Sequence, residues 1–292
     1  MLGREFWAKY FRVYDVLNTV PTYRELLDSI CRELDPQPGT LVLDAGSGTG
    51  NLALRLKGLG CEVVAIDFCK QAVECHTAKG SGCCVLVGDL TNGLPFRDDC
   101  FDGIVCNNVL YTLSARDQLK AAKEFHRVLK PGGRVALANP KAGWKPMAIY
   151  LRSIAYGIRD EGRWVTAKKV ARGIVPTVRM FYYNGKLREE KEYHYFELGE
   201  QRTLLEASGF LGVSDTALVY ADQVVLNSAL KGVAESAGDG PTTRERITVL
   251  EQMELPGVGR RLPLMLFPQA GQDGDSEVAE DGGGSVPSSS SS

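Results

Sequence analysis

Apolar runs alternate with segments of helical periodicity along most of the chain, up to about residue 230. Because "TLVLDAG", "CEVVAID", "CCVLVGD", "FDGIVCN" and "GRVALANP" are short, apolar and rich in β-branched residues, they predict buried strands. The segments between them, such as "NLALRLKGLG" and "SARDQLKAAKEFHRVLKPGG", have helical spacing. This alternation is typical of βαβ units and predicts a parallel sheet with helices on both faces.

Further elements are expected before and after this alternating region. Residues 5–33 show the mixed apolar and aromatic spacing of helices, and a proline opens the second of them. The segment "LGEQRTLLEASGF" predicts another helix that stops at Gly209. After it, "LGVSDTALVY" and "DQVVLNSALK" predict two strands that turn at Ala221 and Asp222, so a hairpin is expected to end the domain.

A long insertion separates the fifth strand from that last helix. Within it, "KPMAIYLRSIAYGIR" has an apolar stripe with arginines off the stripe, which predicts an amphipathic helix. "VRMFYYNGKL" adds aromatic residues and a further turn. The stripe is formed by Met147, Tyr150, Leu151, Ile154 and Ile158.

These patterns divide the chain into five parts. Residues 1–36 are expected to form helices over a ligand site, residues 37–140 the core, and residues 141–195 a basic lid. Residues 196–231 complete the core with a helix and the hairpin. From residue 232 to 292 the composition shifts to Gly, Ser, Asp, Glu and Pro, which predicts a disordered tail, although "LPLMLFP" within it could dock on the domain or on a partner.

Composition narrows the class of protein. Acidic and basic residues nearly cancel, 36 against 34, which argues against a surface built throughout for nucleic acid. Neither a signal sequence nor an apolar run of about 20 residues is seen, so a cytoplasmic location is expected. The eight cysteines lack zinc-ligand or disulfide spacing, and we expect reduced thiols and no metal site.

The stretch "LVLDAGSGTGN" ends the first strand with a glycine turn, where open α/β sheets bind ligands. Its glycines, Gly46, Gly48 and Gly50, have G-x-G-x-G spacing, and Asn51 stands where a dinucleotide fingerprint needs its third glycine. Asp44 beside the turn would repel a pyrophosphate but attract an ammonium or sulfonium group. S-adenosylmethionine carries both of these cations and no phosphate, so it fits this turn better than NAD does.

Other strand ends supply the rest of the predicted cofactor site. Asp67 ends the second strand, where a carboxylate can accept hydrogen bonds from ribose hydroxyls. Asp89 ends the third strand and could accept from an adenine amino group, with Leu90 and Phe68 contacting the ring. The fourth strand would place Asn107, with Asn108, beneath the methionine portion.

These ordered motifs resemble those of class I S-adenosylmethionine-dependent methyltransferases. The resemblance is carried by "LDAGSGTG", the strand-end Asp67, "GDLTNGLPFRDDCFD" and "FHRVLKPGG", and it spans about residues 38–140. It implies a doubly wound, Rossmann-like, seven-stranded, mostly parallel sheet with an antiparallel last strand and, in this chain, a helical insertion after the fifth strand. It also implies S-adenosyl-L-methionine as the cofactor and assigns the same residues to it: Asp44, Gly46, Gly48, Gly50, Asp67, Asp89, Leu90 and Asn107.

Within that family, "LPFRDDCFD" and "RVLKPGG" resemble the small-molecule, lipid and quinone methyltransferases. Two departures bear on the acceptor. "CNNVLY" replaces the arginine-asparagine pair that quinone enzymes usually carry, and the N-P-P-Y or D-P-P-Y motif of many nitrogen methyltransferases is missing. The resemblance therefore implies a small-molecule or lipid-like acceptor without fixing its chemistry.

The insertion concentrates positive charge in a near-neutral chain. Only Asp160 and Glu161 are acidic between residues 141 and 188. The segment could be a solvated helical lid, a grip for an anionic acceptor, or a contact with an anionic membrane surface. RNA binding is a further reading, but no RNA-binding module accompanies it. The basic residues are Lys141, Lys145, Arg152, Arg159, Arg163, Lys168, Lys169, Arg172, Arg179, Lys186 and Arg188.

Methyl transfer from a sulfonium mainly requires alignment of the acceptor and exclusion of water. Should the acceptor need a base, the candidates are His194 in "EYHYFE", Tyr111 after the fourth strand, and Tyr14 from the N-terminal helix. A surface or pocket-lining role is the alternative for His194. An RNA or protein methyltransferase, an NAD-binding oxidoreductase and a non-catalytic scaffold are the competing functions.

Overall fold

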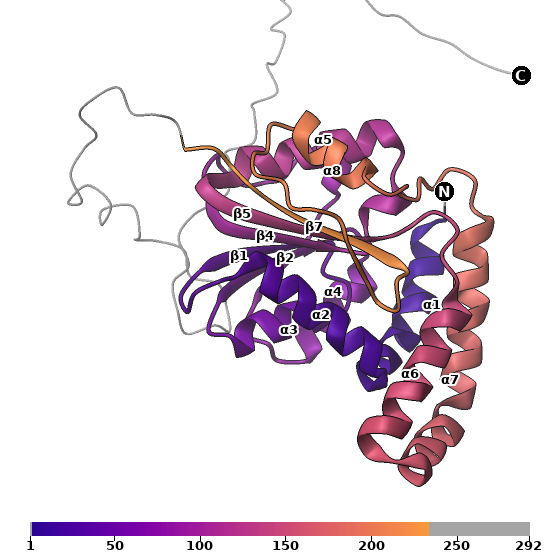
Figure 1. The fold of residues 1–292 in the computed structure, drawn as a ribbon. Coiled ribbons are helices and arrows are strands. Elements are labelled where there is room, and N and C mark those ends of the chain that lie inside the picture. Colours follow the sequence, from indigo (N-terminus) through magenta and orange to yellow (C-terminus); the bar gives the residue numbers. More distant parts are fainter. Residues whose placement is uncertain (1, 234–292) are drawn as a thin grey trace, which may run out of the picture.

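The computed structural model describes residues 2–233 and places them in a sheet of seven strands with order β3-β2-β1-β4-β5-β7-β6 (Figure 1). All neighbouring strands from β3 to β5 run parallel, and β7 is antiparallel to both β5 and β6. This confirms the expected Rossmann-like sheet with its antiparallel last strand. The strands are β1 Leu41–Ala45, β2 Glu62–Asp67, β3 Cys84–Val87, β4 Phe101–Asn107, β5 Leu129–Pro140, β6 Ala217–Val219 and β7 Val224–Leu230.

Helices cover both faces of the sheet because its strands are apolar on both sides. Figure 1 shows α2 and α3 on one face and α5 and α8 on the other. Two buried clusters fill the layers, one around α2 and α3 and one around α5 and α8. The helices are α1 Arg4–Tyr14, α2 Pro21–Leu34, α3 Asn51–Gly58, α4 Lys70–Ala78, α5 Ala115–Val128, α6 Pro146–Glu161, α7 Arg163–Glu189 and α8 Glu200–Ala207, with 3₁₀ turns η1 Asp15–Thr19, η2 Leu90–Asn92 and η3 Leu110–Thr112.

A buried amide network fixes the antiparallel edge of the sheet. Gln201 on α8 accepts a hydrogen bond from Asn139 of β5 at 2.8 Å and donates to the carbonyl oxygen of Leu137 at 2.9 Å. It also donates to Asn227 of β7 at 3.1 Å. Asn139, Gln201 and Asn227 are fully buried, so every missing partner would leave a desolvated amide. The network therefore holds β7 against β5 in one register.

The insertion forms a helical hairpin, α6 and α7, that projects away from the sheet (Figure 1). The expected turn at Asn184 and Gly185 is wrong, because α7 continues to Glu189. Burial of Met180 and Leu187 and the ring contact of Tyr183 with Tyr10 hold this stretch helical, since tertiary packing outweighs the low propensity of Asn and Gly. None of the described helices combines the length and apolar character that crossing a membrane requires.

Only part of the apolar stripe predicted for α6 faces inward, since Tyr150 and Ile154 are half-buried. Ile149, Ser153 and Gly157 form the buried face, and the Ser153 hydroxyl bonds Thr22 of α2 at 2.6 Å. Met147 and Leu151 of the predicted stripe are exposed instead. The buried face consists of small residues because α6 packs closely on its neighbours. A side-chain carbon at Gly157 would lie 3.0 Å from the Thr166 hydroxyl.

The second strand of the expected hairpin is β7, as predicted. The first strand, β6, is shorter than the predicted segment "LGVSDTALVY". Only Ala217–Val219 pairs as a strand, and Leu211 forms an isolated bridge with Leu230. The hairpin turns at Ala221 and Asp222 as predicted. All eight cysteines are free, and five of them are buried. The region from residue 234 onward, including "LPLMLFP", lies outside the described residues.

Candidate functional site

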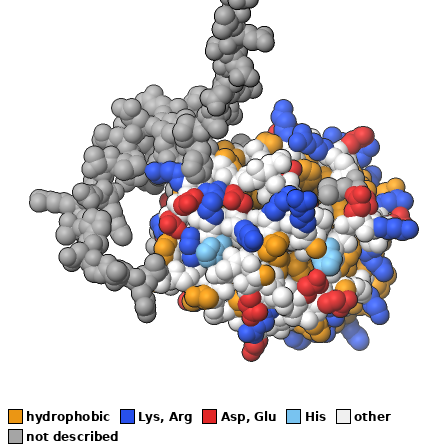
Figure 2. Space-filling model, turned by 90° about the horizontal axis from the view of Figure 1, so that it is seen from above, with side chains coloured by type: hydrophobic (Ala, Val, Ile, Leu, Met, Phe, Trp, Pro, Cys, Tyr) orange, Lys and Arg blue, Asp and Glu red, His pale blue; other side chains and the backbone are white. Residues whose placement is uncertain are grey.

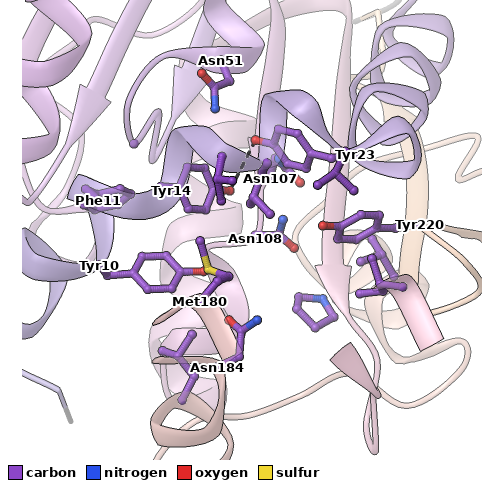
Figure 3. A pocket seen from close by; sticks show the side chains of 18 of the residues that line it. Tyr10, Phe11, Tyr14, Tyr23, Asn51, Asn107, Asn108, Met180, Asn184 and Tyr220 are labelled. Carbon is purple, nitrogen blue, oxygen red and sulfur yellow. Dashed lines mark hydrogen bonds between the residues drawn. The ribbon is translucent and has the colours of Figure 1, made fainter. Parts of the chain in front are cut away.

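A cavity of about 370 Å³ lies at the carboxyl edge of the sheet, beside the glycine turn. Strand ends, α1, α2, both insertion helices and the β6–β7 turn contribute to its lining. Figure 3 shows aromatic side chains and asparagines from these separate segments directed into one interior. One part of the cavity is polar and carries the strand-end carboxylates, and the other part is aromatic.

The turn after β1 depends on its glycines. Gly46, Gly48 and Gly50 all have positive φ, a region that only glycine enters without strain. Side-chain carbons would also collide with neighbours: at Gly46 one would lie 2.3 Å from Val109 Cγ2, and at Gly50 one would lie 2.2 Å from His76 Cδ2. The turn therefore brings its backbone close to β4, to α4 and to the cavity.

Asp67 ties the end of β2 to this turn. Its Oδ2 accepts from the Gly48 amide and its Oδ1 from the Cys69 amide, both at 2.8 Å. Burial raises the pKa of Asp67 to about 6, against the lowering effect of these two hydrogen bonds. Each carboxylate oxygen keeps a further lone pair, and the residue lines the cavity. The geometry is compatible with the ribose-binding role expected for Asp67.

Two buried acceptor oxygens next to the turn have no donor within the described residues: Asp44 Oδ2 and Asn107 Oδ1. They come from the ends of the adjacent strands β1 and β4, and both residues line the cavity. Burial, followed by the nearby charge of Asp67, raises the pKa of Asp44 to about 7. A ligand with several N–H donors and positive charge would satisfy both oxygens, and the ammonium of a methionine end has this chemistry.

The predicted adenine contacts lie on the same wall. Asp89 caps η2 through Oδ1, which accepts from the amide of Thr91 at 2.9 Å and from its hydroxyl at 2.8 Å. Its Oδ2 has no hydrogen bond among those of the described residues, and Leu90 beside it is buried. Phe68 is half-buried and its ring contacts Trp7 of α1 edge-on. All three predicted residues, Asp89, Leu90 and Phe68, line the cavity.

The N-terminal helices close over the turn. The Thr49 hydroxyl donates to Asp15 at 2.6 Å, which anchors η1 to the glycine loop. Phe11 of α1 lies where a side chain at Gly48 would place its carbon, 3.0 Å away. Residues from the start of the chain thereby cover the polar part of the cavity.

The second part of the cavity is an aromatic chamber, which we define by Tyr10, Tyr14, Tyr23, Tyr220 and Met180 (Figure 3). Tyr23 donates a hydrogen bond to the Tyr14 hydroxyl at 3.4 Å. Burial raises the pKa of each of the four tyrosines, so their hydroxyls stay protonated near neutral pH. The chamber therefore offers apolar surface and neutral hydrogen-bonding groups.

Tyr220 reaches the chamber from a strained turn. Tyr220, Ala221 and Asp222 have φ values of 54°, 56° and 61°, three successive non-glycine residues in the left-handed region. Such conformations cost free energy and persist where surrounding contacts impose them. Here the Tyr220 ring packs against Tyr23, with ring centres 6.0 Å apart, and Asp222 pairs with Arg152 of α6.

The three candidate bases have different locations. Tyr14 and Tyr111 line the cavity, but burial raises the pKa of both phenols, so both stay protonated and can donate a hydrogen bond but cannot take up a proton as a base. His194 does not line the cavity. Its Nε2 contacts Glu200 Oε1 at the start of α8, and its backbone bonds Tyr111 and Gln118. The structure thus places His194 where it positions the loop before α8.

The basic side chains of the insertion mostly stay outside. Among the eleven, Lys169 alone lines the cavity, and it pairs with Glu161. On the face that carries α5 and α8, seen in Figure 2, basic and acidic side chains are interspersed. An anionic acceptor would therefore find no free cation among the described cavity residues. The described residues also contain no cluster of His, Cys, Asp or Glu that could hold a metal ion.

Several residues of this site were not singled out from the sequence: Tyr23, Tyr220, Met180 and His76. His76 is fully buried beneath Gly50, and burial lowers its pKa to about 4, so it is a neutral packing residue. Tyr23, Met180 and Tyr220 come from α2, α7 and the β6–β7 turn, and no local spacing in the sequence links them.

Comparisons with known proteins agree with this geometry. Residues 43–137 match the family model described as a methyltransferase domain. Probable tRNA methyltransferase 9B of Mus musculus is 36% identical over 129 residues, which cover 41% of this chain and 27% of the mouse protein. Demethylmenaquinone methyltransferase of Paenarthrobacter aurescens is 34% identical over 131 residues, 45% of this chain and 50% of that protein. The chain thus spans half or less of the length of these relatives.

A solved structure shares the fold. A chain from the complex of the Haloferax volcanii Trm112 methyltransferase activator with a methyltransferase superposes with a TM-score of 0.54 at 16% identity, over 80% of this chain and all of that one. Residues 43–137, which carry the glycine turn and the strand-end aspartates, thus resemble a methyltransferase domain in sequence, and the solved structure shares the fold.

Proposed function

We propose that this protein transfers a methyl group from S-adenosylmethionine to an uncharged, largely apolar small molecule or lipid-like acceptor. The observation that carries the proposal is the aromatic chamber, which is continuous with the cofactor part of the cavity. Apart from the strand-end aspartates, the charged residues of the lining are Asp117, Glu161 and Lys169, and the last two pair with each other. Apolar ligands suit such a lining, since no charge is left to be buried unpaired.

The cofactor part has the groups that this donor needs. Asp44 and Asn107 would hold its ammonium, Asp67 its ribose hydroxyls, and Asp89, Leu90 and Phe68 its adenine. When bound, S-adenosylmethionine supplies an electrophilic methyl group on a positively charged sulfur. The glycine turn would let the backbone approach the methionine end closely.

The residues of the chamber would act by positioning. The hydroxyls of Tyr14 and Tyr220 can donate hydrogen bonds to an acceptor oxygen and direct its lone pair toward the methyl carbon, while Tyr23 donates to Tyr14. On ionising, an acceptor hydroxyl would release its proton to solvent water. Its oxygen would then bond the methyl carbon while the bond between carbon and sulfur breaks and its electrons stay on sulfur. Because no chamber residue is a strong base, the arrangement favours an acceptor that ionises readily, such as a phenol or an enol.

A nucleic-acid acceptor is the second candidate, because the chain shares 36% identity with a protein named as a tRNA methyltransferase. A cavity of about 370 Å³ would hold one small molecule or one flipped base, so its size is compatible with both candidates.

Two measurements test the proposal. Calorimetry with S-adenosylhomocysteine should give micromolar binding, and NAD as the control ligand should give none. Labelled donor should then be offered with phenolic, quinol and lipid-like acceptors in one set and with bulk tRNA in another. We expect label in the first set. Label in tRNA alone would establish the second candidate, and binding of NAD alone would overturn the cofactor.

A further inference from the structure

The outer face of α7 is an exposed apolar stripe. Trp164, Val175, Val178 and Tyr182 are 85%, 60%, 62% and 62% exposed. With Lys168 and Ala171 they repeat at alternating spacings of four and three residues, so they lie along one side of the helix. The inner side is marked by the buried residues Thr166, Met180 and Leu187. Nothing in the described part of the chain covers the stripe.

Helix α6 carries a matching stripe. Met147, Leu151 and Ile158 are 53%, 59% and 43% exposed, and Ala155 continues the row. The buried side of α6 faces α2 and α7 through Ser153 and Gly157. We call the exposed row of α7 the outer face of the hairpin. Exposed apolar area of this extent, with an aromatic residue at the tip of the hairpin, indicates a contact surface.

The charge of α7 indicates which kind of partner its exposed stripe can bind. Helix α7 has seven basic residues and one acidic residue, Glu189, which lies at its end. Lys168, Arg172 and Arg179 border the apolar stripe and form no ion pair within the described residues. A second copy of this chain would bring like charges together, which is unfavourable. The stripe requires a partner that is both apolar and anionic.

We propose that the outer face of the hairpin docks on an anionic lipid surface. Aliphatic Val175 and Val178 between basic residues fit the boundary of a bilayer, where apolar side chains enter the acyl region and cations meet the phosphates. Trp164 and Tyr182 have the amphipathic rings that are enriched at that depth. RNA would satisfy the cations but would leave the valines without a partner.

The cavity extends along the inner side of the hairpin, behind the exposed stripe of α7. Its lining continues between α6 and α7 through Gly157, Thr166, Val170 and Gly173 to Lys169 near the tip. A lipid-like acceptor that entered at the tip of the hairpin would follow this lining into the aromatic chamber. This last step rests on the proposed function, whereas the docking does not.

Flotation of the protein with vesicles tests the docking without cofactor or turnover. We expect binding to phosphatidylcholine vesicles that contain phosphatidylglycerol, weak binding to phosphatidylcholine alone, and loss of binding in high salt. The triple variant Trp164→Ala, Val175→Ala, Val178→Ala should bind at least about tenfold more weakly, and so should Lys168→Gln, Arg172→Gln, Arg179→Gln. None of these six residues lines the cavity.

Matched controls use other exposed residues. Leu59→Ala with Leu198→Ala removes apolar area elsewhere, and Arg116→Gln with Lys123→Gln removes charge from α5. Both controls should float as the wild type does. All variants should bind S-adenosylhomocysteine with unchanged affinity, which also shows that they are folded.

Three results would overturn the docking: no flotation of the wild type, equal flotation of the hairpin variants and the wild type, or a hairpin-dependent dimer in sedimentation that does not bind vesicles. Hairpin-dependent binding to RNA with no flotation would assign the surface to nucleic acid instead. If the wild type floats but methylates none of the small acceptors, the docking stands and the proposed function fails.

Discussion

The imidazole of His76 occupies the space that a side chain at Gly50 would need. A side-chain carbon at position 50 would lie 2.2 Å from His76 Cδ2, closer than any two such atoms approach. His76 is fully buried, and its Nδ1 lies 3.4 Å from the hydroxyl of Ser47 in the same turn. The glycine turn is thus shaped from below by α4 as well as by its own backbone.

We expect Gly50→Ala to destabilise the protein by about 2 to 4 kcal/mol, because it adds left-handed strain to a collision with His76. Adding His76→Ala should remove the collision, so the double variant should lose at least about 1 kcal/mol less than the sum of the single variants. Urea unfolding measures this. Gly58→Ala, where nothing lies within 4 Å, is the control and should be neutral or stabilising. Strict additivity of the pair would contradict the packing argument.

The raised pKa values of Asp44 and Asp67 predict how the stability of the unliganded protein depends on pH. In the folded state Asp44 holds its proton up to a pKa of about 7 and Asp67 up to about 6, whereas both ionise near 4 when unfolded. The two protonated carboxyls contribute to the free energy of unfolding below about pH 4, and this contribution is lost as the pH rises toward about 7. The melting temperature of Asp44→Asn should therefore rise relative to that of the wild type as the pH increases across this window. A constant difference between the two proteins would rule out the shift.

Cofactor binding should show the opposite trend. A cationic ligand pairs with ionised Asp44, so the affinity for S-adenosylhomocysteine should rise from about pH 6 to about pH 8 and then level off. Asp44→Asn should bind more weakly and with little dependence on pH. Calorimetry in matched buffers checks this, and an unchanged pH profile in the variant would remove Asp44 from the ammonium site.

Asp67→Ala should weaken the binding of S-adenosylhomocysteine by about 1 to 3 kcal/mol, the cost of an unpaired ribose diol. It also leaves the amides of Gly48 and Cys69 without an acceptor, so some stability should be lost. Asp102→Ala is the matched control, because that carboxylate accepts from the Leu41 amide at 3.0 Å but does not line the cavity. The Asp102→Ala variant should lose stability but keep its affinity for S-adenosylhomocysteine. Equal affinities for the two variants would refute the assignment.

Tyr220→Phe and Tyr14→Phe each remove a hydroxyl from the chamber and keep the ring. We expect kcat/KM for the acceptor to fall about tenfold for each, and the affinity for S-adenosylhomocysteine to stay the same. Tyr156→Phe, on α6 outside the cavity, should change neither. Tighter cofactor binding or unaltered turnover in both chamber variants would place the acceptor elsewhere.

The strained turn gives a prediction about stability. Ala221→Gly should stabilise the protein by about 0.5 to 1 kcal/mol, since glycine adopts a φ of 56° without steric cost. Ala155→Gly in α6 is the contrasting change and should destabilise by about 1 kcal/mol. Chemical unfolding compares them. Destabilisation by Ala221→Gly would show that the turn is not strained.

The sheet, and the position of three aspartates at one edge of it, were predictable because their signals are local. Asp44, Asp67 and Asp89 each end an apolar run, and parallel strands bring such ends to one edge. The chamber was not predictable in this way, because Tyr23 and Tyr220 meet only after α2 and the β6–β7 turn have packed. The buried face of α6 was predicted wrongly for a related reason. Helix α6 packs closely on α2 and α7, so Ser153 and Gly157 are buried there in place of larger apolar residues.

The amide network around Gln201 has a consequence for how this chamber can diversify. Residues in a strand alternate between faces, so a shift of β7 by one residue would turn its whole set of side chains over. Because β7 follows directly from the turn that carries Tyr220, such a shift would also withdraw that tyrosine from the cavity. New acceptor specificities should therefore arise by exchanging side chains on α1, α2 and α7. Insertions and deletions near the β6–β7 turn should be selected against.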